Sequence, residues 1–335
     1  YYGEELVDLI RRDRETVYMQ DTFRSMLFIL LAGLLLWLNF KKRLPGKWMI
    51  LSLGVLIVVD LVSVDLRYVN KDDFVTRRQL GNSFPMTQAD KQILQDTAHY
   101  RVLNPTEGLN GARTSYYHKS LGGYHAAKPQ RLRDLFEFHI YQNNRRVLDM
   151  LNTKYLIQAD EEGNPRAALN PGALGNAWFV SQLTAVESPD QAIQALGNLD
   201  PAREAIVNTN DFPEVVPGTF EVDSTSQIRL VSYTANALEY ISENPEAGMG
   251  VFSEMYYPEG WKAYIDGKPE PHFRVNYALR GMVIPGGRHE ITFRFEPEVI
   301  RLGSQISLAG TAVLAVLFLG SIGISIFRKR GSHGA

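Results

Sequence analysis

The chain has 335 residues, of which 45% are hydrophobic, and carries a formal net charge of −2 at pH 7. This length allows two domains with sizeable cores, and a net charge near zero excludes an overall field that would attract nucleic acid. The sequence has no cysteine, which excludes a disulfide framework and a zinc site built on cysteine pairs.

Two apolar segments follow each other near the N-terminus. Residues 25–40, SMLFILLAGLLLWLNF, carry no charge and are slightly shorter than the roughly 17–25 residues of a typical membrane helix. Flanking basic side chains can extend to the interface and compensate for the difference. Trp48–Leu66 is the second segment. We expect two transmembrane helices within residues 25–66, although a pair of buried core helices also fits the pattern.

A third apolar segment, residues 302–327, has no charged residue, and a membrane helix is again expected over a buried core helix. Basic residues lie in the tail after it, residues 328–335, and in the loop 41–47. An odd number of crossings separates these two clusters, so both lie on the same side, which the positive-inside rule makes the cytoplasm. Residues 1–24, a juxtamembrane segment, and residues 67–301 are then outside the cytoplasm.

The sequence begins at Tyr1 with neither a methionine nor a signal peptide. We expect it to be part of a longer protein.

Residues 67–213 combine helix and strand signals and predict an extracytoplasmic α+β domain. Thr87 and Pro129 suit the start of two helices, and Ser188-Pro189 opens another. Short strand-like segments, such as Tyr100–Leu103, lie between them.

Helix signals end after residue 213, and alternating segments predict a β-sandwich module over residues 214–301. In His289–Phe295 apolar and polar side chains alternate, as in a strand with one buried face. Turn signals at Asp266-Gly267 and Gly286-Gly287 separate successive strands. The expected fold class is membrane α-helical, with an extracytoplasmic α+β domain and a C-terminal β-sandwich or jelly-roll-like module.

The sequence contains no Walker loop, dinucleotide fingerprint, nucleophile elbow or zinc-protease helix. The spacing of His118 and His125 is not that of metal ligands and indicates loop or surface positions, so we predict no metal site. Asp60 and Asp65 lie near the outer end of the second apolar segment, where an acidic side chain is a functional candidate. The alternative is that both reach interfacial water.

A loop rich in planar donors and aromatic rings runs from Tyr100 to Tyr124. Arg101, Asn104 and Tyr124 offer a guanidinium, an amide and an aromatic face, which suit sugar hydroxyls and ring C–H groups. The alternative is that these are ordinary loop residues.

Several segments, in the same order, resemble the YfhO family of bacterial membrane proteins. They extend over nearly the whole chain and are DTFRSMLFILLAG, YRVLNPTEG, SLGGYHAAKPQRL, VLDMLNTKYLI, GNAWFV and the run from SEMYYPEGWKAYIDG to HEITFRFEP. The resemblance implies a polytopic protein of the bacterial inner (cytoplasmic) membrane, related to glycosyltransferases of the GT-C type. These enzymes take a sugar from a polyprenyl-phosphate carrier and transfer it to an acceptor outside the cytoplasm.

One departure from that pattern concerns the chemistry. GT-C enzymes carry an acidic catalytic residue in the first outer loop, and no residue here matches it, so we expect that loop upstream of Tyr1 and assign no catalytic residue. The resemblance implies a polyprenyl-phosphate-linked sugar as donor, and no other cofactor is identified. The implied partners are the lipid bilayer and an envelope glycan or polymer acceptor. The alternative is a non-enzymatic membrane-anchored module for glycan binding or envelope assembly.

The aromatic block Met255–Lys268, MYYPEGWKAYIDGK, is either the inside of a sheet or a contact surface. Trp261 follows a bend at Gly260 and is the aromatic residue that strand alternation determines least, so core packing, sugar stacking and a membrane-interface role are all open for it. Arg can pair with phosphate and rings can stack on sugars, so we predict a substrate-binding site at the seam between the two outer parts. Its predicted members are Arg101, Asn104, Tyr124, Trp261 and Arg280.

Overall fold

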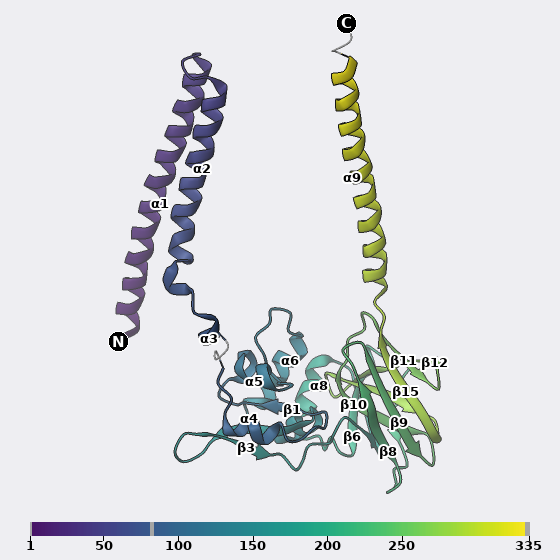
Figure 1. Ribbon diagram of the computed structural model, residues 1–335. Coiled ribbons are helices and arrows are strands. Elements are labelled where there is room, and N and C mark those ends of the chain that lie inside the picture. The colour runs from purple at the N-terminus through teal and green to yellow at the C-terminus, as the bar shows by residue number, and fades with distance from the viewer. Residues whose placement is uncertain (1, 81–83, 332–335) are drawn as a thin grey trace. The chain divides into compact units, whose positions relative to one another are not determined.

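The chain divides into two units, Tyr1–Ser83 and Phe84–Ala335, and the computed structural model describes residues 2–80 and 84–331. Two long helices that lie side by side form most of the first unit, α1 (Tyr2–Phe40) and α2 (Gly46–Tyr68) (Figure 1). Two short elements follow them, η1 (Lys71–Asp73) and α3 (Arg77–Leu80).

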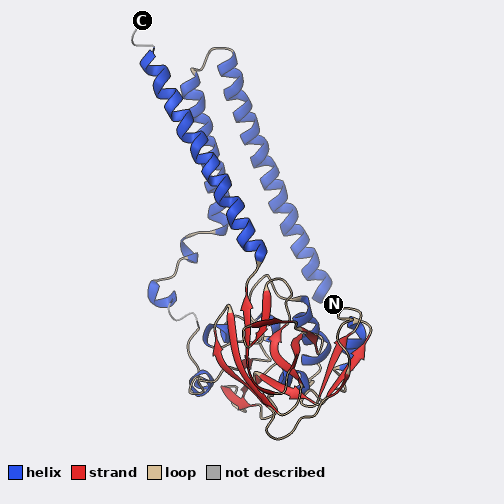
Figure 2. Cartoon of the chain, turned by 90° about the vertical axis from the view of Figure 1, so that its right-hand side faces the viewer, coloured by secondary structure: helices blue, strands red, loops and turns tan. Residues whose placement is uncertain are grey.

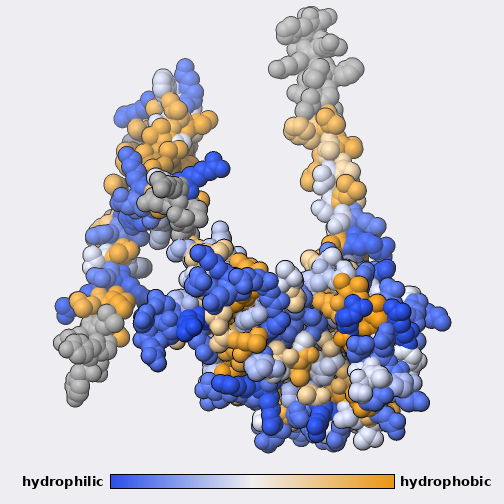
Figure 3. All heavy atoms as spheres, turned by 60° about the horizontal axis from the view of Figure 1, so that its bottom comes forward, coloured by the Kyte–Doolittle hydropathy of each residue, from blue (hydrophilic) through white to orange (hydrophobic). Residues whose placement is uncertain are grey.

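Both long helices are long and apolar enough to cross a membrane, over Val7–Phe40 and Gly46–Tyr68. Their apolar side chains are exposed and not packed in a core, as for Leu30 (60%) and Ile50 (67%). Figure 3 shows these apolar side chains as orange bands. The expected pair of membrane helices is therefore confirmed, and the alternative of buried core helices is not what the structure has.

The first helix is longer than expected, because it includes the charged segment before residue 25 and continues for 39 residues. Residues 7–24 contain neither glycine nor proline, so nothing in that segment interrupts the helix. An ion pair between Arg11 and Asp8, at 3.1 Å and one turn apart, lies on this stretch. A helix of this length spans about 58 Å, nearly twice the roughly 30 Å of a hydrocarbon core.

In the second unit, a three-stranded sheet of order β1–β2–β3 comes first. Its strands are β1 (Arg101–Leu103), β2 (Thr153–Ala159) and β3 (Pro165–Leu169). The helical elements around it are α4 (Gln88–Ile93), η2 (Gly108–Asn110), α5 (Arg113–Tyr117), α6 (Gln130–Leu135), the π-helical segment η3 (Phe136–Ile140) and α7 (Arg145–Met150). Thr87 caps α4 as predicted, since its hydroxyl accepts a hydrogen bond from the backbone N–H of Asp90 at 3.3 Å.

Two larger sheets face each other in the remainder of this unit (Figure 2). The seven-stranded sheet has the order β4 (Ala177–Val180), β10 (Gly248–Met255), β14 (Leu279–Ile284), β13 (Phe273–Val275), β6 (Glu204–Asn208), β5 (Gln182–Val186) and β7 (Gly218–Thr219). The five-stranded sheet has the order β12 (Lys268–Glu270), β11 (Trp261–Ile265), β15 (Gly287–Phe295), β9 (Ala237–Asn244) and β8 (Gln227–Tyr233). Between them, the ring of Phe252 packs 5.0 Å from Tyr240 and 4.9 Å from Phe293. The predicted sandwich architecture is confirmed.

The seven-stranded sheet combines strands from both sides of residue 213, where the sequence suggested a domain boundary. β10 pairs with β4, and β13 pairs with β6. This sheet has a core on each face: Val251 packs with the helices, including α8 (Pro189–Ala195), whereas Phe252 packs with the five-stranded sheet. The α+β part and the sandwich therefore share one sheet.

The last strand leads through Glu296 and Pro297 into α9 (Glu298–Gly331). This helix can span a membrane over Glu298–Ser321, and its apolar side chains are exposed, as for Leu308 at 72%. The third expected membrane helix is confirmed.

Candidate functional site

Arg101 joins the small sheet to the seven-stranded sheet. Its Nη2 lies 2.9 Å from Oε1 of Glu254 on β10, and its Nη1 donates to the carbonyl oxygens of Leu151 at 3.0 Å and Ser253 at 2.6 Å. The guanidinium is thus bound on several sides by its own chain. This contact lies where the sequence predicted the seam between the two outer parts.

Glu254 is the acidic centre of this contact, with only 15% of its side chain exposed. Burial alone would raise the pKa of the Glu254 carboxyl, but the positive charges of Arg101 and Arg280 and a hydrogen bond from His99 outweigh burial and lower it. Glu254 is therefore ionised at neutral pH, and it balances part of the surrounding positive charge.

Arg280 lies deeper, on β14, and is 3% exposed. Its Nε donates to the carbonyl oxygen of Met255 at 3.1 Å, and its guanidinium carbon lies 4.2 Å from the ring centre of Trp261. Burial lowers the pKa of Arg280, and Glu254 opposes that change, but an arginine remains charged. Its Nη1 is buried with no hydrogen-bond partner among the described residues.

His272 is a half-buried polar side chain whose ring is close enough to Arg280 to feel its charge. Burial, with a further contribution from the charge of Arg280, lowers the pKa of His272 to about 4, so its ring is neutral at neutral pH. Within the described residues, its Nε2 also has no hydrogen-bond partner. Among the described residues, Arg280 and His272 thus each keep one side-chain nitrogen without a hydrogen-bond partner.

Lys119, His99 and Tyr233 form the outer side of the contact. The His99 ring stacks on Tyr233 with 3.8 Å between ring centres, and its Nε2 lies 3.8 Å from the Glu254 carboxylate. The Lys119 ammonium contacts Nδ1 of His99 and lies 4.4 Å from the Tyr233 ring centre. Since a lysine ammonium can only donate, Nδ1 accepts, and a neutral His99 carries its proton on the side facing Glu254.

We call this group the Glu254 cluster; its members are His99, Arg101, Lys119, Tyr233, Glu254, Trp261 and Arg280. Three of its side chains are cationic at neutral pH, and one carboxylate faces them. Lys119 is exposed and Tyr233 is 41% exposed, so one cation and one ring can reach a ligand. This arrangement suits an anionic or hydroxyl-rich group in contact with an aromatic face.

The structure brings three of the five predicted site residues into this cluster, Arg101, Trp261 and Arg280. The other two lie outside it. Asn104 forms a turn, with its amide donating to Glu107 at 2.9 Å and its Oδ1 accepting from the backbone of Thr106 at 3.1 Å. Tyr124 is 82% exposed, and within the described part of the chain no hydrogen bond, ion pair or ring contact joins it to the cluster.

The members that sequence reasoning missed are His99, Lys119, Tyr233 and Glu254. Lys119 lies within the segment HKSLGGYH, where attention went to the two histidines. Glu254 is the last residue but one of β10, in which consecutive residues are buried, so alternation could not indicate that it points into a contact.

His118 is not at the surface, in contrast to the expectation from its loop position. Its side chain is 2% exposed, and its Nε2 lies 3.0 Å from Asp90, which Arg113 also contacts at 2.5 Å. Burial opposes ionisation of Asp90, but these partners and Thr87 hold the pKa of its carboxyl well below the usual range. The group fixes the loop to α4. Among residues 2–80 and 84–331, no three His, Cys, Asp or Glu side chains gather as a metal site would require.

Asp60 faces the neighbouring helix of the first unit. Its carboxylate lies 3.5 Å from Arg24 on α1, and Asp21 on α1 pairs with Arg67 on α2 at 2.7 Å. Asp65 has no such ion pair among the described residues. The structure therefore distinguishes two acidic residues that the sequence treated alike.

Comparison with known protein families gives a match over part of the second unit. The family model described as "Bacterial membrane protein YfhO" matches residues 221–307, which comprise β8 to β15 and the first turns of α9. The match agrees with the resemblance found in the sequence. No curated protein and no solved structure matches this chain.

Proposed function

We propose that this chain, a membrane protein of the YfhO family, contributes the binding surface for a lipid-linked sugar in transfer to a cell-envelope glycan or polymer. The Glu254 cluster is the proposed contact. The observation that carries the proposal is its excess of cations over carboxylates, with Lys119 and Tyr233 accessible at its outer side.

The buried and exposed members have different roles in this proposal. Arg101 and Arg280 donate hydrogen bonds to groups of their own chain and hold β1, β10 and β14 in place. They are therefore positioning residues. The Lys119 ammonium contacts His99 and has further N–H donors that can pair with a phosphate or a hydroxyl oxygen, and the Tyr233 ring can pack on a sugar face. The ligand therefore contacts Lys119 and Tyr233, and the buried Arg101 and Arg280 hold these two side chains in position.

The proposed location is the bacterial cytoplasmic membrane, with the second unit's sheets on the outer side. The support is the distribution of basic residues, which lie at positions 41–47, between α1 and the start of α2, and at positions 328–330, at the end of α9. On that side the cluster would face the compartment in which polyprenyl-linked sugars are used.

The test is transfer of sugar from a polyprenyl-phosphate donor by the full-length membrane protein, with the catalytic loop that the resemblance implies, carrying Lys119→Ala or Tyr233→Ala. We expect each change to lower transfer about tenfold, the loss of one charge-assisted or stacking contact, at unchanged membrane protein level. The matched controls are Lys91→Ala, at an exposed position of α4, and Tyr257→Ala, at a residue that is 50% exposed. Unchanged transfer in the Lys119 variant, or a loss equal to that of the controls, would contradict the proposal.

A further inference from the structure

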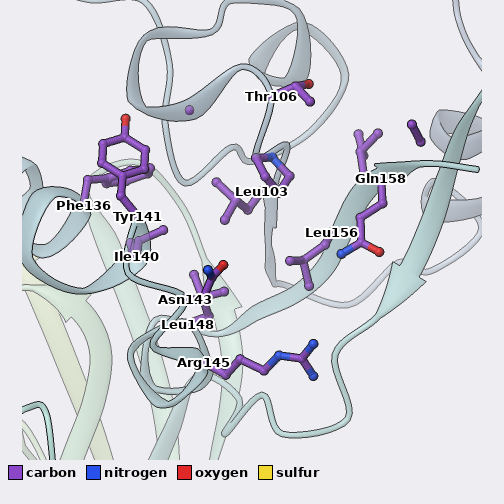
Figure 4. A pocket seen from close by; sticks show the side chains of 14 residues that line it. Leu103, Thr106, Phe136, Ile140, Tyr141, Asn143, Arg145, Leu148, Leu156 and Gln158 are labelled. Atoms are coloured by element: carbon purple, nitrogen blue, oxygen red, sulfur yellow. The ribbon is translucent and has the colours of Figure 1, made fainter. Parts of the chain in front are cut away.

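A cavity of about 540 Å³ lies in the α+β part of the second unit, and none of its lining residues belongs to the Glu254 cluster. Figure 4 shows Phe136, Ile140 and Tyr141 on one side, Leu156 and Gln158 of β2 on the other, and Leu103 between them. Phe136 is fully buried and Leu103 is 3% exposed, so the floor of the cavity is core surface. Its volume falls within the roughly 300–1,000 Å³ of small-molecule sites.

One wall of the cavity is a π-helical turn that other elements hold in place. The backbone N–H of Tyr141 donates to the carbonyl of Phe136 at 2.9 Å, which closes the wide turn. His139 contacts the carbonyl oxygen of Ile193 at 2.7 Å, and the amide of Asn144 donates to the carbonyl of Leu196 at 3.1 Å. Such turns are uncommon and frequent at functional sites. This wall is preformed, because α8 and the residue after it fix it from behind.

Among the described residues, Arg145 is the only charged residue that lines the cavity. Arg145 lines the cavity, is exposed, and has no hydrogen-bond or ion-pair partner among the described residues. No Asp or Glu lines the cavity. The neighbouring hollow, which shares Gln158 and Ala159 with the cavity, is lined by the acidic loop Asp160–Glu162 and also by Arg166. A negative group is therefore favoured beside Arg145.

We propose that this cavity binds an amphipathic molecule with one anionic headgroup, a carboxylate or a phosphate, which pairs with Arg145 while its hydrocarbon part lies on Leu103, Ile140 and Leu156. Arginine offers a planar fork that matches either headgroup. Covering the apolar floor with hydrocarbon favours binding, because each Å² of apolar surface removed from water contributes about 25 cal/mol. This site is independent of the function proposed for the Glu254 cluster.

The test is calorimetric titration of the whole protein in lipid nanodiscs with hexyl phosphate, hexanoate and hexanol, each corrected for empty discs. We expect at least one of the two anions to bind about tenfold more tightly than hexanol. Arg145→Ala should remove that difference, whereas Arg229→Ala, which removes an exposed arginine on β8 outside the cavity, should not. Ala159→Trp, at an exposed position that lines the cavity, should block all three ligands without disturbing the core.

A preference for hexyl phosphate would identify a phosphorylated lipid as the natural source, and a preference for hexanoate a fatty acid. Equal binding of hexanol, absence of anion binding, or an Arg145→Ala variant that behaves like Arg229→Ala would overturn the proposal. Because Lys119→Ala leaves this cavity intact, loss of transfer in that variant with normal anion binding would separate the two sites.

Discussion

Gly260 determines how the aromatic block meets the last strand. Its φ is +123°, and a Cβ there would lie 2.9 Å from both Phe295 and Pro297. The backbone N–H of Glu296 donates to the Gly260 carbonyl at 2.6 Å, and the Trp261 ring lies 5.3 Å from that of Phe295. The block therefore packs against the point where β15 leads toward α9, and Trp261 is a half-buried part of that packing.

Gly260→Ala is expected to destabilise the second unit by roughly 2–4 kcal/mol, since it adds backbone strain to a steric overlap. The matched control is Gly163→Ala, which has a φ of +83° but no atom within 4 Å of the added Cβ. The Gly163→Ala variant has the backbone strain without the steric overlap, and this strain costs roughly 1–2 kcal/mol. Thermal unfolding of both variants in detergent measures the difference in stability. Equal shifts of the unfolding temperature would show that the neighbours of residue 260 move aside without a loss of stability.

At the scale of elements, the pair α1–α2 is held by charges as well as by apolar contact. Asp60 lies thirteen residues after Lys47 and hence about 20 Å along the helix from the basic loop. If that loop marks one interface, Asp60 is still within a hydrocarbon layer of about 30 Å, where an acidic group needs a partner. Arg24 is that partner.

Asp60→Asn is expected to destabilise the helix pair by roughly 1–3 kcal/mol, whereas Asp65→Asn, which has no ion pair among the described residues, should have little effect. When Asp60→Asn is combined with Arg24→Gln, the loss of stability should be smaller than the sum of the two single losses, because both changes break the same ion pair. Thermal unfolding in lipid measures this cycle. Additive losses would mean that the two side chains do not interact in the membrane.

At the scale of the molecule, the sequence predicted what depends on local pattern. Apolar segments without charge predicted the three membrane helices, and alternation predicted the strands after residue 213. It could not predict that β4 and β6 pair with β10 and β13, because such pairing joins segments far apart in the chain and leaves no local signature. For the same reason, the sequence predicted Arg101 and Arg280 as members of the site at the seam but did not predict Glu254, whose carboxylate contacts Arg101 from a distant part of the chain.

The orientation of the whole chain can be tested with single cysteines, since the sequence contains none. One is placed at Ser226, just before β8, and one at Gly46, where an added side chain meets only the amide of Asn39 at 3.9 Å. The basic residues at 41–47 and at 328–330, at the end of α9, favour the cytoplasm for both clusters, so the sheets between them should lie outside. An impermeant thiol reagent should then label position 226 in cells with an intact cytoplasmic membrane but with access to its outer face. Position 46 should react only after that membrane is permeabilised. The reverse pattern would place the Glu254 cluster in the cytoplasm, away from sugars that are used outside, and the proposed function would fall with it.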